Sequence, residues 1–151
     1  MTLTAKEHDI LTDLKTQEQL CILKYTRYEN EAHDPALKQI FSEIKATEAE
    51  HLATVERMIR GEEVAMNTPG KSAAEDKFTG KCYNGTEDEK QADAYLCRDA
   101  LSMEKHVSSV YNTGLFEFNS PTLRDTLNHI QREEQNHGEK LYSYMSACSM
   151  Y

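Results

Sequence analysis

The 151-residue sequence has no tryptophan, only three prolines and only 8% aromatic residues. Together with 28% charged residues, this composition is more typical of a helical bundle than of a β-sandwich or barrel. No stretch approaches the roughly 18 consecutive apolar residues that suggest a membrane-spanning helix. The first residues, Met1 to Asp9, lack the apolar segment of a secretory signal peptide. We therefore expect no membrane partner, and synthesis in the cytoplasm.

Positive charge is also scarce, because 17 Lys and Arg face 26 Asp and Glu and give a formal net charge of -9. Nucleic acid would repel such a chain, so we expect no nucleic-acid partner. The four cysteines form no Cys-x-x-Cys pair, which argues against a structural zinc site, and their spacing matches no small secreted disulfide scaffold. Cys21 and Cys97 are predicted to be small core residues, whereas Cys82 and Cys148 are the reactive candidates and their cross-linking stays open.

The pattern Glu-x-x-His occurs twice, at Glu48–His51 and at Glu134–His137, with an offset of 86 residues. At this offset residues 7–59 align with 93–145, and nine positions are identical. The identical positions include two further pairs of glutamates, Glu18 with Glu104 and Glu31 with Glu117. The first of these pairs joins the two motifs in two matched sets of two glutamates and one histidine.

Each half of the repeat predicts two helices joined by a short turn. Asp34 and Ser120 can cap the second helix of their halves, and Pro35 and Pro121 suit the first helical position. We predict a single domain, 1–151, with helices near 5–32, 35–60, 88–118 and 121–146. Residues 61–87, which contain Pro69, are predicted to form a long crossover. The predicted fold is all-α, an antiparallel four-helix bundle of two helical hairpins with ferritin-like connectivity.

The six residues of the repeat fall on the apolar face of their predicted helices, at alternating spacings of three and four. The predicted core positions are Leu11, Leu14, Glu18, Cys21, Tyr25 and Tyr28; Leu37, Phe41, Ile44, Glu48, His51, Val55 and Met58; Cys97, Ala100, Glu104, Val107 and Tyr111; and Leu123, Leu127, Ile130, Glu134, His137, Leu141 and Tyr144. At about 1.5 Å per residue, all four glutamates lie about 21–24 Å from the turns, in one layer.

Four carboxylates in an apolar core are very costly unless positive charge balances them. Two divalent cations would supply that charge, and a glutamate and a histidine three residues apart can hold the same ion. Oxygen and imidazole ligands suit Fe or Mn, so we predict two Fe ions, or a Mn/Fe or Mn pair, with Zn as a possible substitute. Glu18 and Glu104 would be terminal ligands with His51 and His137, and Glu48 and Glu134 would bridge. The alternative is a set of ligands that holds no metal in the working protein.

Three further residues are candidates for a role beside the metal ligands. Tyr25 and Tyr111 each follow a candidate glutamate by seven residues, so they either hydrogen-bond the site, relay electrons or form an aromatic core layer. Glu133 precedes Glu134 and can hold a histidine across the site, although Thr47 is its counterpart in the repeat. The histidines outside the ligand layer are predicted to be surface residues: His8, His33, His106 and His129.

Nearly the whole chain resembles the ferritin-like di-iron carboxylate superfamily, which includes bacterioferritin and rubrerythrin. The six metal ligands of that superfamily match six residues of this chain one for one: Glu18, Glu48, His51, Glu104, Glu134 and His137. The chain differs from rubrerythrin because it has no rubredoxin cysteines and has Val107 where that family often has another glutamate. Residues 93–151 more closely resemble the coat F family of spore coat proteins, through Leu101 to His106, Tyr111-Asn112, Glu117, Pro121, Leu123-Arg124 and Glu133-Glu134, with a different C-terminal tail.

The first resemblance implies a protein that reacts with O2 or peroxide, as an oxidase, a ferroxidase or a peroxide scavenger. The second implies deposition in the spore coat, with other coat proteins as partners, and it implies no chemistry. We also expect a homo-oligomer. The alternative function is that of a structural spore coat protein whose metal site is inactive or empty.

Overall fold

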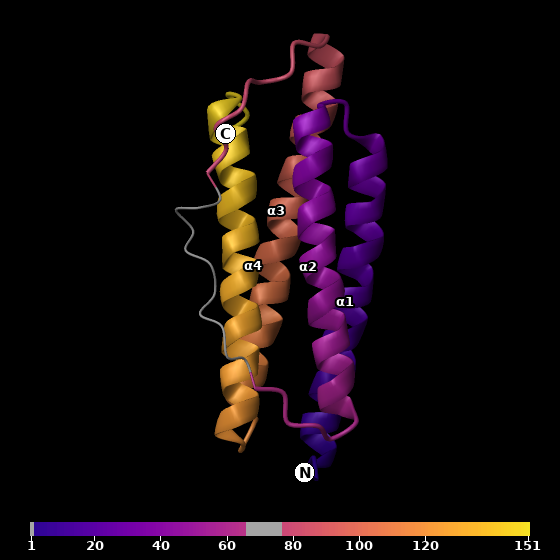
Figure 1. Ribbon diagram of the computed structural model, residues 1–151, viewed down its shortest axis with the longest axis vertical. Coiled ribbons are helices and arrows are strands. Elements are labelled where there is room, and N and C mark those ends of the chain that lie inside the picture. Colours follow the sequence, from indigo (N-terminus) through magenta and orange to yellow (C-terminus); the bar gives the residue numbers. More distant parts are fainter. Residues whose placement is uncertain (1, 66–76) are drawn as a thin grey trace.

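Four α-helices make up most of the computed structural model, which describes residues 2–65 and 77–151 (Figure 1). They are α1 (Ala5–Glu31), α2 (Pro35–Ile59), α3 (Glu87–Leu115) and α4 (Pro121–Ala147). The described residues contain no strand, so the prediction of an all-helical fold is confirmed. The predicted bounds differ from the observed ones by at most three residues. Part of the predicted crossover, including Pro69, lies outside the described residues.

Side chains just before each helix satisfy the free backbone N–H groups of its first turn. Asp34 accepts a hydrogen bond from the backbone N–H of Ala36, and Ser120 accepts one from Leu123. Pro35 and Pro121 follow directly, as predicted, because proline has no N–H to satisfy. The helices α1 and α3 begin with capping boxes, which the sequence pattern Thr-x-x-Glu allows at Thr4 and Thr86.

Two helical hairpins form the bundle, α1 with α2 and α3 with α4, and they lie side by side (Figure 1). A buried acid of each hairpin holds the turn of the other hairpin. Asp93 accepts hydrogen bonds from the backbone N–H groups of His33 (2.8 Å) and Asp34 (2.9 Å). Glu7, which is the counterpart of Asp93 in the repeat, accepts one from Asn119 at 3.2 Å. These reciprocal contacts fix the two hairpins relative to each other.

All of the predicted core positions are buried, from Leu11 on α1 to Tyr144 on α4. The core is apolar and aromatic over most of its length, and Tyr25, Tyr28 and Phe41 pack their rings together at centroid distances of 5.3–6.0 Å. Six of the buried core positions are the glutamates and histidines of the repeat, so the apolar core surrounds a polar layer.

A disulfide joins Cys82 in the second part of the crossover to Cys148, which directly follows α4. The Cα atoms of the two residues are 5.5 Å apart. Nearby, the Phe78 backbone N–H donates to Ser143 Oγ at 2.8 Å, and the Phe78 ring packs on Tyr144. The second part of the crossover therefore lies along α4, and the cross-link that the sequence left open is an intrachain one. Cys21 and Cys97 are free and buried, as predicted.

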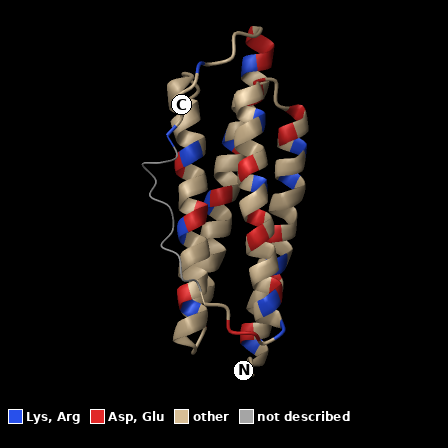
Figure 2. Ribbon diagram, in the orientation of Figure 1, with Lys and Arg blue, Asp and Glu red and all other residues tan. Residues whose placement is uncertain are grey.

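Acidic and basic side chains are interspersed along the helices (Figure 2). Several form ion pairs at the surface, among them Lys6 with Glu117 at 2.7 Å and Lys45 with Glu29 at 2.5 Å. Exposed pairs of this kind contribute little to stability, so the core and the caps determine the fold. None of the described helices is long and apolar enough to cross a membrane.

Candidate metal centre

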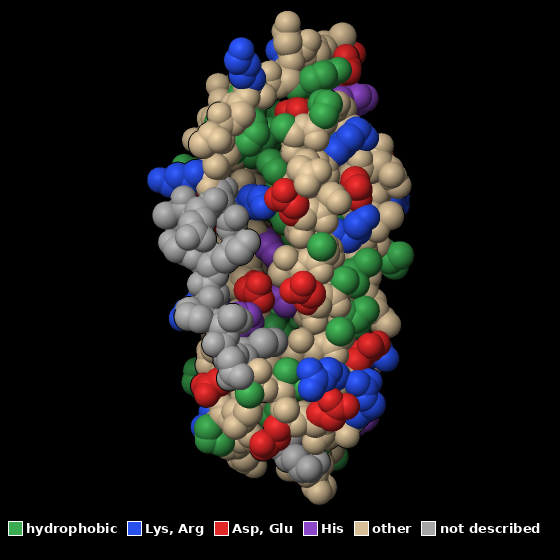
Figure 3. Space-filling model, viewed as in Figure 1, with side chains coloured by type: hydrophobic (Ala, Val, Ile, Leu, Met, Phe, Trp, Pro, Cys, Tyr) green, Lys and Arg blue, Asp and Glu red, His purple; other side chains and the backbone are tan. Residues whose placement is uncertain are grey.

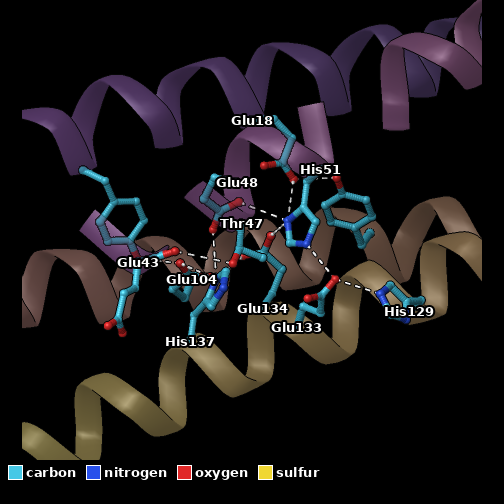
Figure 4. Close-up of polar contacts among 12 residues, drawn as sticks. Glu18, Glu43, Thr47, Glu48, His51, Glu104, His129, Glu133, Glu134 and His137 are labelled. Carbon is cyan, nitrogen blue, oxygen red and sulfur yellow. Dashed lines mark hydrogen bonds and ion pairs between the residues drawn. The ribbon is translucent and has the colours of Figure 1, made fainter. Parts of the chain in front are cut away.

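The six predicted ligands converge on one point of the core, and each helix contributes at least one of them (Figure 4). Their donor atoms form two groups in which all the atoms lie within 4.8 Å of one another. One group consists of Glu18, Glu48, His51 and Glu134, and the other of Glu48, Glu104, Glu134 and His137. The two groups share Glu48 and Glu134, which are the residues predicted to bridge.

The first group surrounds the Nδ1 atom of His51. This nitrogen lies 2.9 Å from Glu134 Oε1, 3.2 Å from Glu48 Oε2 and 3.9 Å from Glu18 Oε1. Three carboxylates from three different helices therefore face one side of a single imidazole.

The second group repeats this arrangement around His137. Its Nδ1 atom lies 3.0 Å from Glu48 Oε1, 3.4 Å from Glu104 Oε1 and 3.7 Å from Glu134 Oε2. Glu48 and Glu134 thus each direct one oxygen toward His51 and the other toward His137. A carboxylate with its two oxygens in two such groups has the arrangement of a bridging ligand.

Three buried oxygens of the centre have no hydrogen-bond partner among the described residues: Glu18 Oε2, Glu104 Oε2 and Glu134 Oε2. A buried polar atom without a partner costs about 1–3 kcal/mol, and a charged one costs more. Divalent cations would satisfy these oxygens directly, and the mixture of carboxylates and imidazoles suits Fe, Mn or Zn. The residues present therefore fit a pair of metal ions.

The carboxylates also shift one another's pKa values. Burial, together with the charges of Glu48 and Glu134, raises the pKa of Glu18 well above its usual value. Burial and the charge of Glu134 act to raise the pKa of Glu48 as well, but hydrogen bonds from His137 and His51 hold it below its usual value. In the absence of cations, Glu18 therefore resists ionisation, whereas Glu48 ionises more readily than a glutamate in water.

The acidic surroundings also raise the pKa values of both histidines, which favours their charged form. Burial acts to lower the pKa of His51, but hydrogen bonds to Glu133, Glu134 and Glu48 raise it well above its usual value. Burial also acts to lower the pKa of His137, but the charge of Glu104 and hydrogen bonds to Glu104, Glu134 and Glu48 raise it well above its usual value. Protons on the two imidazoles therefore offset part of the negative charge of the centre, and a cation that bound there would have to displace them.

The two candidate tyrosines contact the glutamates that were predicted to be terminal ligands. Tyr111 on α3 donates to Glu18 Oε1 on α1, and Tyr25 on α1 donates to Glu104 Oε1 on α3, both at 2.5 Å. Burial and then the nearby glutamates raise the pKa of both phenols, so the hydroxyls stay protonated and act as donors. Each hydroxyl can thus orient one glutamate, and the electron relay stays a prediction.

Glu133 contacts the outer side of His51. Its Oε1 atom lies 3.2 Å from His51 Nε2 and 2.8 Å from His129 Nε2 (Figure 4). The prediction for His129 was wrong, because its side chain is only 15% exposed and pairs with Glu133, whereas His8, His33 and His106 are exposed as predicted. The spacing of four residues between His129 and Glu133, which places both on one helix face, is the sequence signal that could have indicated this contact.

Histidine and acidic side chains are visible at the surface between α4 and α2, about halfway along the bundle (Figure 3). His137 is 7% exposed, whereas Glu18 and Glu48 are fully buried. The centre therefore lies nearest to solvent on the side of His137.

Residues 92–151 match the family model of the Coat F domain. The match covers most of α3 and all of α4, and it includes Glu104, Glu134 and His137 but not the three ligands of the first hairpin. Neither the curated proteins nor the solved structures contain a match to the chain. The resemblance to coat F proteins is supported over these residues, and the resemblance to ferritin-like proteins stays an expectation.

Proposed function

We propose that this protein binds two transition-metal ions, Fe or Mn, and reacts with O2 or peroxide as an oxidase, a ferroxidase or a peroxide scavenger. The fold would be a ferritin-like antiparallel bundle. The main support is that Glu48 and Glu134 each direct one oxygen toward His51 and the other toward His137. Glu18 and His51 would hold one ion, Glu104 and His137 would hold the other, and Glu48 and Glu134 would join them. The bound ions would supply the electrons and the Lewis acidity for reduction of the oxidant.

The surrounding residues of the chain orient and shield these ligands. Glu133 accepts from the outer nitrogen of His51, which would keep a proton on that nitrogen while the inner nitrogen exchanges its own proton for an ion. Tyr111 and Tyr25 each donate to one oxygen of Glu18 and Glu104, and the second oxygen of each glutamate has no hydrogen-bond donor among residues 2–65 and 77–151. These contacts favour a centre whose ligands are oriented before metal arrives. The two phenols are also our candidates for passing an electron to the centre.

Deposition in the spore coat, beside other coat proteins, is the second part of the proposal and is supported by the Coat F match. That match also favours a competing function, a structural coat protein whose metal site is inactive or empty. It spans only three of the six ligands, so membership of that domain family does not by itself require a complete metal centre.

Mixing the reduced metalloprotein with O2 or peroxide in a stopped-flow spectrometer separates the two functions. We expect the protein-bound Fe²⁺ to oxidise faster than free Fe²⁺ and the Glu48→Ala/Glu134→Ala variant to lose this advantage. Glu50→Ala is the matched control, because Glu50 is exposed on the same helix. Oxidation at the rate of free Fe²⁺ would instead support the structural function.

A further inference from the structure

The two histidines of the centre differ in the residues near their outer nitrogen, Nε2, which is the ring nitrogen that faces away from the four glutamates. His51 Nε2 contacts Glu133 Oε1 at 3.2 Å, and the same oxygen is 2.8 Å from His129 Nε2. The imidazole of His51 is therefore held between the carboxylates of the centre and an outer carboxylate, which is itself held by a second histidine.

The repeat puts different residues behind His137. At the offset of 86 residues, Thr47 is the counterpart of Glu133, and Glu43 is the counterpart of His129. The Thr47 side chain is uncharged, and its hydroxyl donates to the backbone oxygen of Glu43 at 3.4 Å. The carboxylate of Glu43 accepts from Gln39 and pairs with Lys140.

All the polar contacts that the described part of the chain makes with His137 belong to its inner nitrogen, Nδ1. Its side chain is also more exposed than that of His51, at 9% against 2%. The pseudo-twofold symmetry of the centre therefore holds for the six ligands and for the two tyrosines that contact them, and it fails at the outer nitrogens of the two histidines.

An outer carboxylate that accepts from a ligating histidine fixes the tautomer and the ring orientation and makes the inner nitrogen a stronger donor. Loss of such a partner typically lowers metal affinity by about 10- to 100-fold. On this basis, and resting on the proposed two-metal function, we propose that the two ions bind with unequal affinity. The ion at His51 binds first and more tightly, and Glu133 is the positioning residue that makes the difference.

Calorimetric titration of the metal-free protein with Mn²⁺, repeated with Co²⁺, tests this. We expect two binding steps that differ by about 10- to 100-fold in affinity. Glu133→Thr gives position 133 the residue that its counterpart, Thr47, has in the other half. We expect this variant to bind more weakly in the tight step, so that the two affinities become similar. Thr47→Glu is the reverse exchange and strengthens the weak step. Glu50→Thr is the control on an exposed site and leaves both steps unchanged.

Two single-site variants assign the steps to their histidines. His137→Ala retains the tight step and His51→Ala retains the weak one. Adding Glu133→Thr to the His137→Ala protein lowers its affinity by about 10- to 100-fold, whereas adding it to the His51→Ala protein has no effect. A purely structural role for Glu133 would weaken binding in both. Circular dichroism of the metal-free variants verifies that each is folded.

Two equal steps in the unmodified protein, or an equal loss in both single-site proteins, would overturn the unequal affinities and leave the two-metal function intact. Absence of any ion from the unmodified protein would overturn the proposed function itself.

Discussion

Replacement of Glu18 by glutamine should change stability in opposite directions with and without metal. The Glu18 side chain is fully buried, its Oε2 atom has no partner among the described residues, and burial and the neighbouring carboxylates raise its pKa. Glutamine keeps the Oε1 acceptor for Tyr111 and replaces the other oxygen with an uncharged amide that can donate to Glu48. Glu18→Gln therefore imitates the protonated carboxyl group and requires neither a buried charge nor the uptake of a proton.

Above its usual pKa of 4.5, a carboxyl group with a raised pKa loses about 1.4 kcal/mol of stability per pH unit until its raised pKa is reached, so at pH 7.5 the uncharged amide should stabilise the metal-free protein by up to about 4 kcal/mol. At roughly 3 °C per kcal/mol for a domain of this size, the Tm of metal-free Glu18→Gln should rise by up to about 12 °C. Bound metal should reverse the order. An ion at 1,000 times its Kd adds about 4.1 kcal/mol to the original protein, which matches the largest expected gain of the variant, and the variant lacks a ligand for that ion.

Thermal unfolding followed by circular dichroism at pH 7.5, once with a chelator and once with Mn²⁺, measures both effects. Glu50→Gln is the control, since Glu50 lies on the surface of α2, and it should shift neither Tm. A variant that is less stable than the original protein in chelator would contradict this expectation, because ionised Glu18 would then be stabilised, not destabilised, by its neighbours in the metal-free protein. An equal increase in Tm on addition of Mn²⁺ to both proteins would show that Glu18 is not a metal ligand.

Three further outcomes are expected. The raised pKa values of Glu18, His51 and His137 stabilise the metal-free protein at low pH, and this contribution is lost as pH rises above about 4.5 for the glutamate and 6.5 for the histidines. The Tm gain from Mn²⁺ should therefore increase between pH 5.5 and 8, and a constant gain would contradict the displacement of protons. Cys82→Ser/Cys148→Ser should lower the free energy of unfolding in urea by up to about 4 kcal/mol, because the disulfide has a sequence separation of 66 residues; no loss would mean that the crossover is not held by this bond. Tyr111→Phe should destabilise the metal-free protein by about 1.5–3 kcal/mol in the same assay, since a buried carboxylate loses its donor, and an unchanged value would show that another donor replaces the phenol.

The helical fold and the polar layer follow from local rules that the sequence displays. Spacings of three and four residues identify the buried face of each helix, and Asp34 and Ser120 mark where the second helix of each hairpin begins. Distances from these turns along straight helices then place Glu18, Glu48 and their counterparts at one height. Such predictions succeed because a helix has a fixed rise and a fixed number of residues per turn.

The remaining features depend on where side chains of different segments meet, which spacing along one helix does not determine. His129 was predicted to be at the surface because it falls outside the ligand layer, yet it reaches Glu133 one turn later on α4. The bond between Cys82 and Cys148 depends on the path of the crossover along α4, for which no periodic pattern exists. The reciprocal bonds of Glu7 and Asp93 cross between hairpins in the same way.

The metal content of the purified protein tests the central claim most directly. The protein would be produced with both iron and manganese, separated from free ions by gel filtration and subjected to elemental analysis beside the Glu48→Ala/Glu134→Ala variant. We expect about two metal ions per chain in the original protein and a large loss in the variant, since both groups of ligands share these two residues. Equal metal in the two proteins would contradict it.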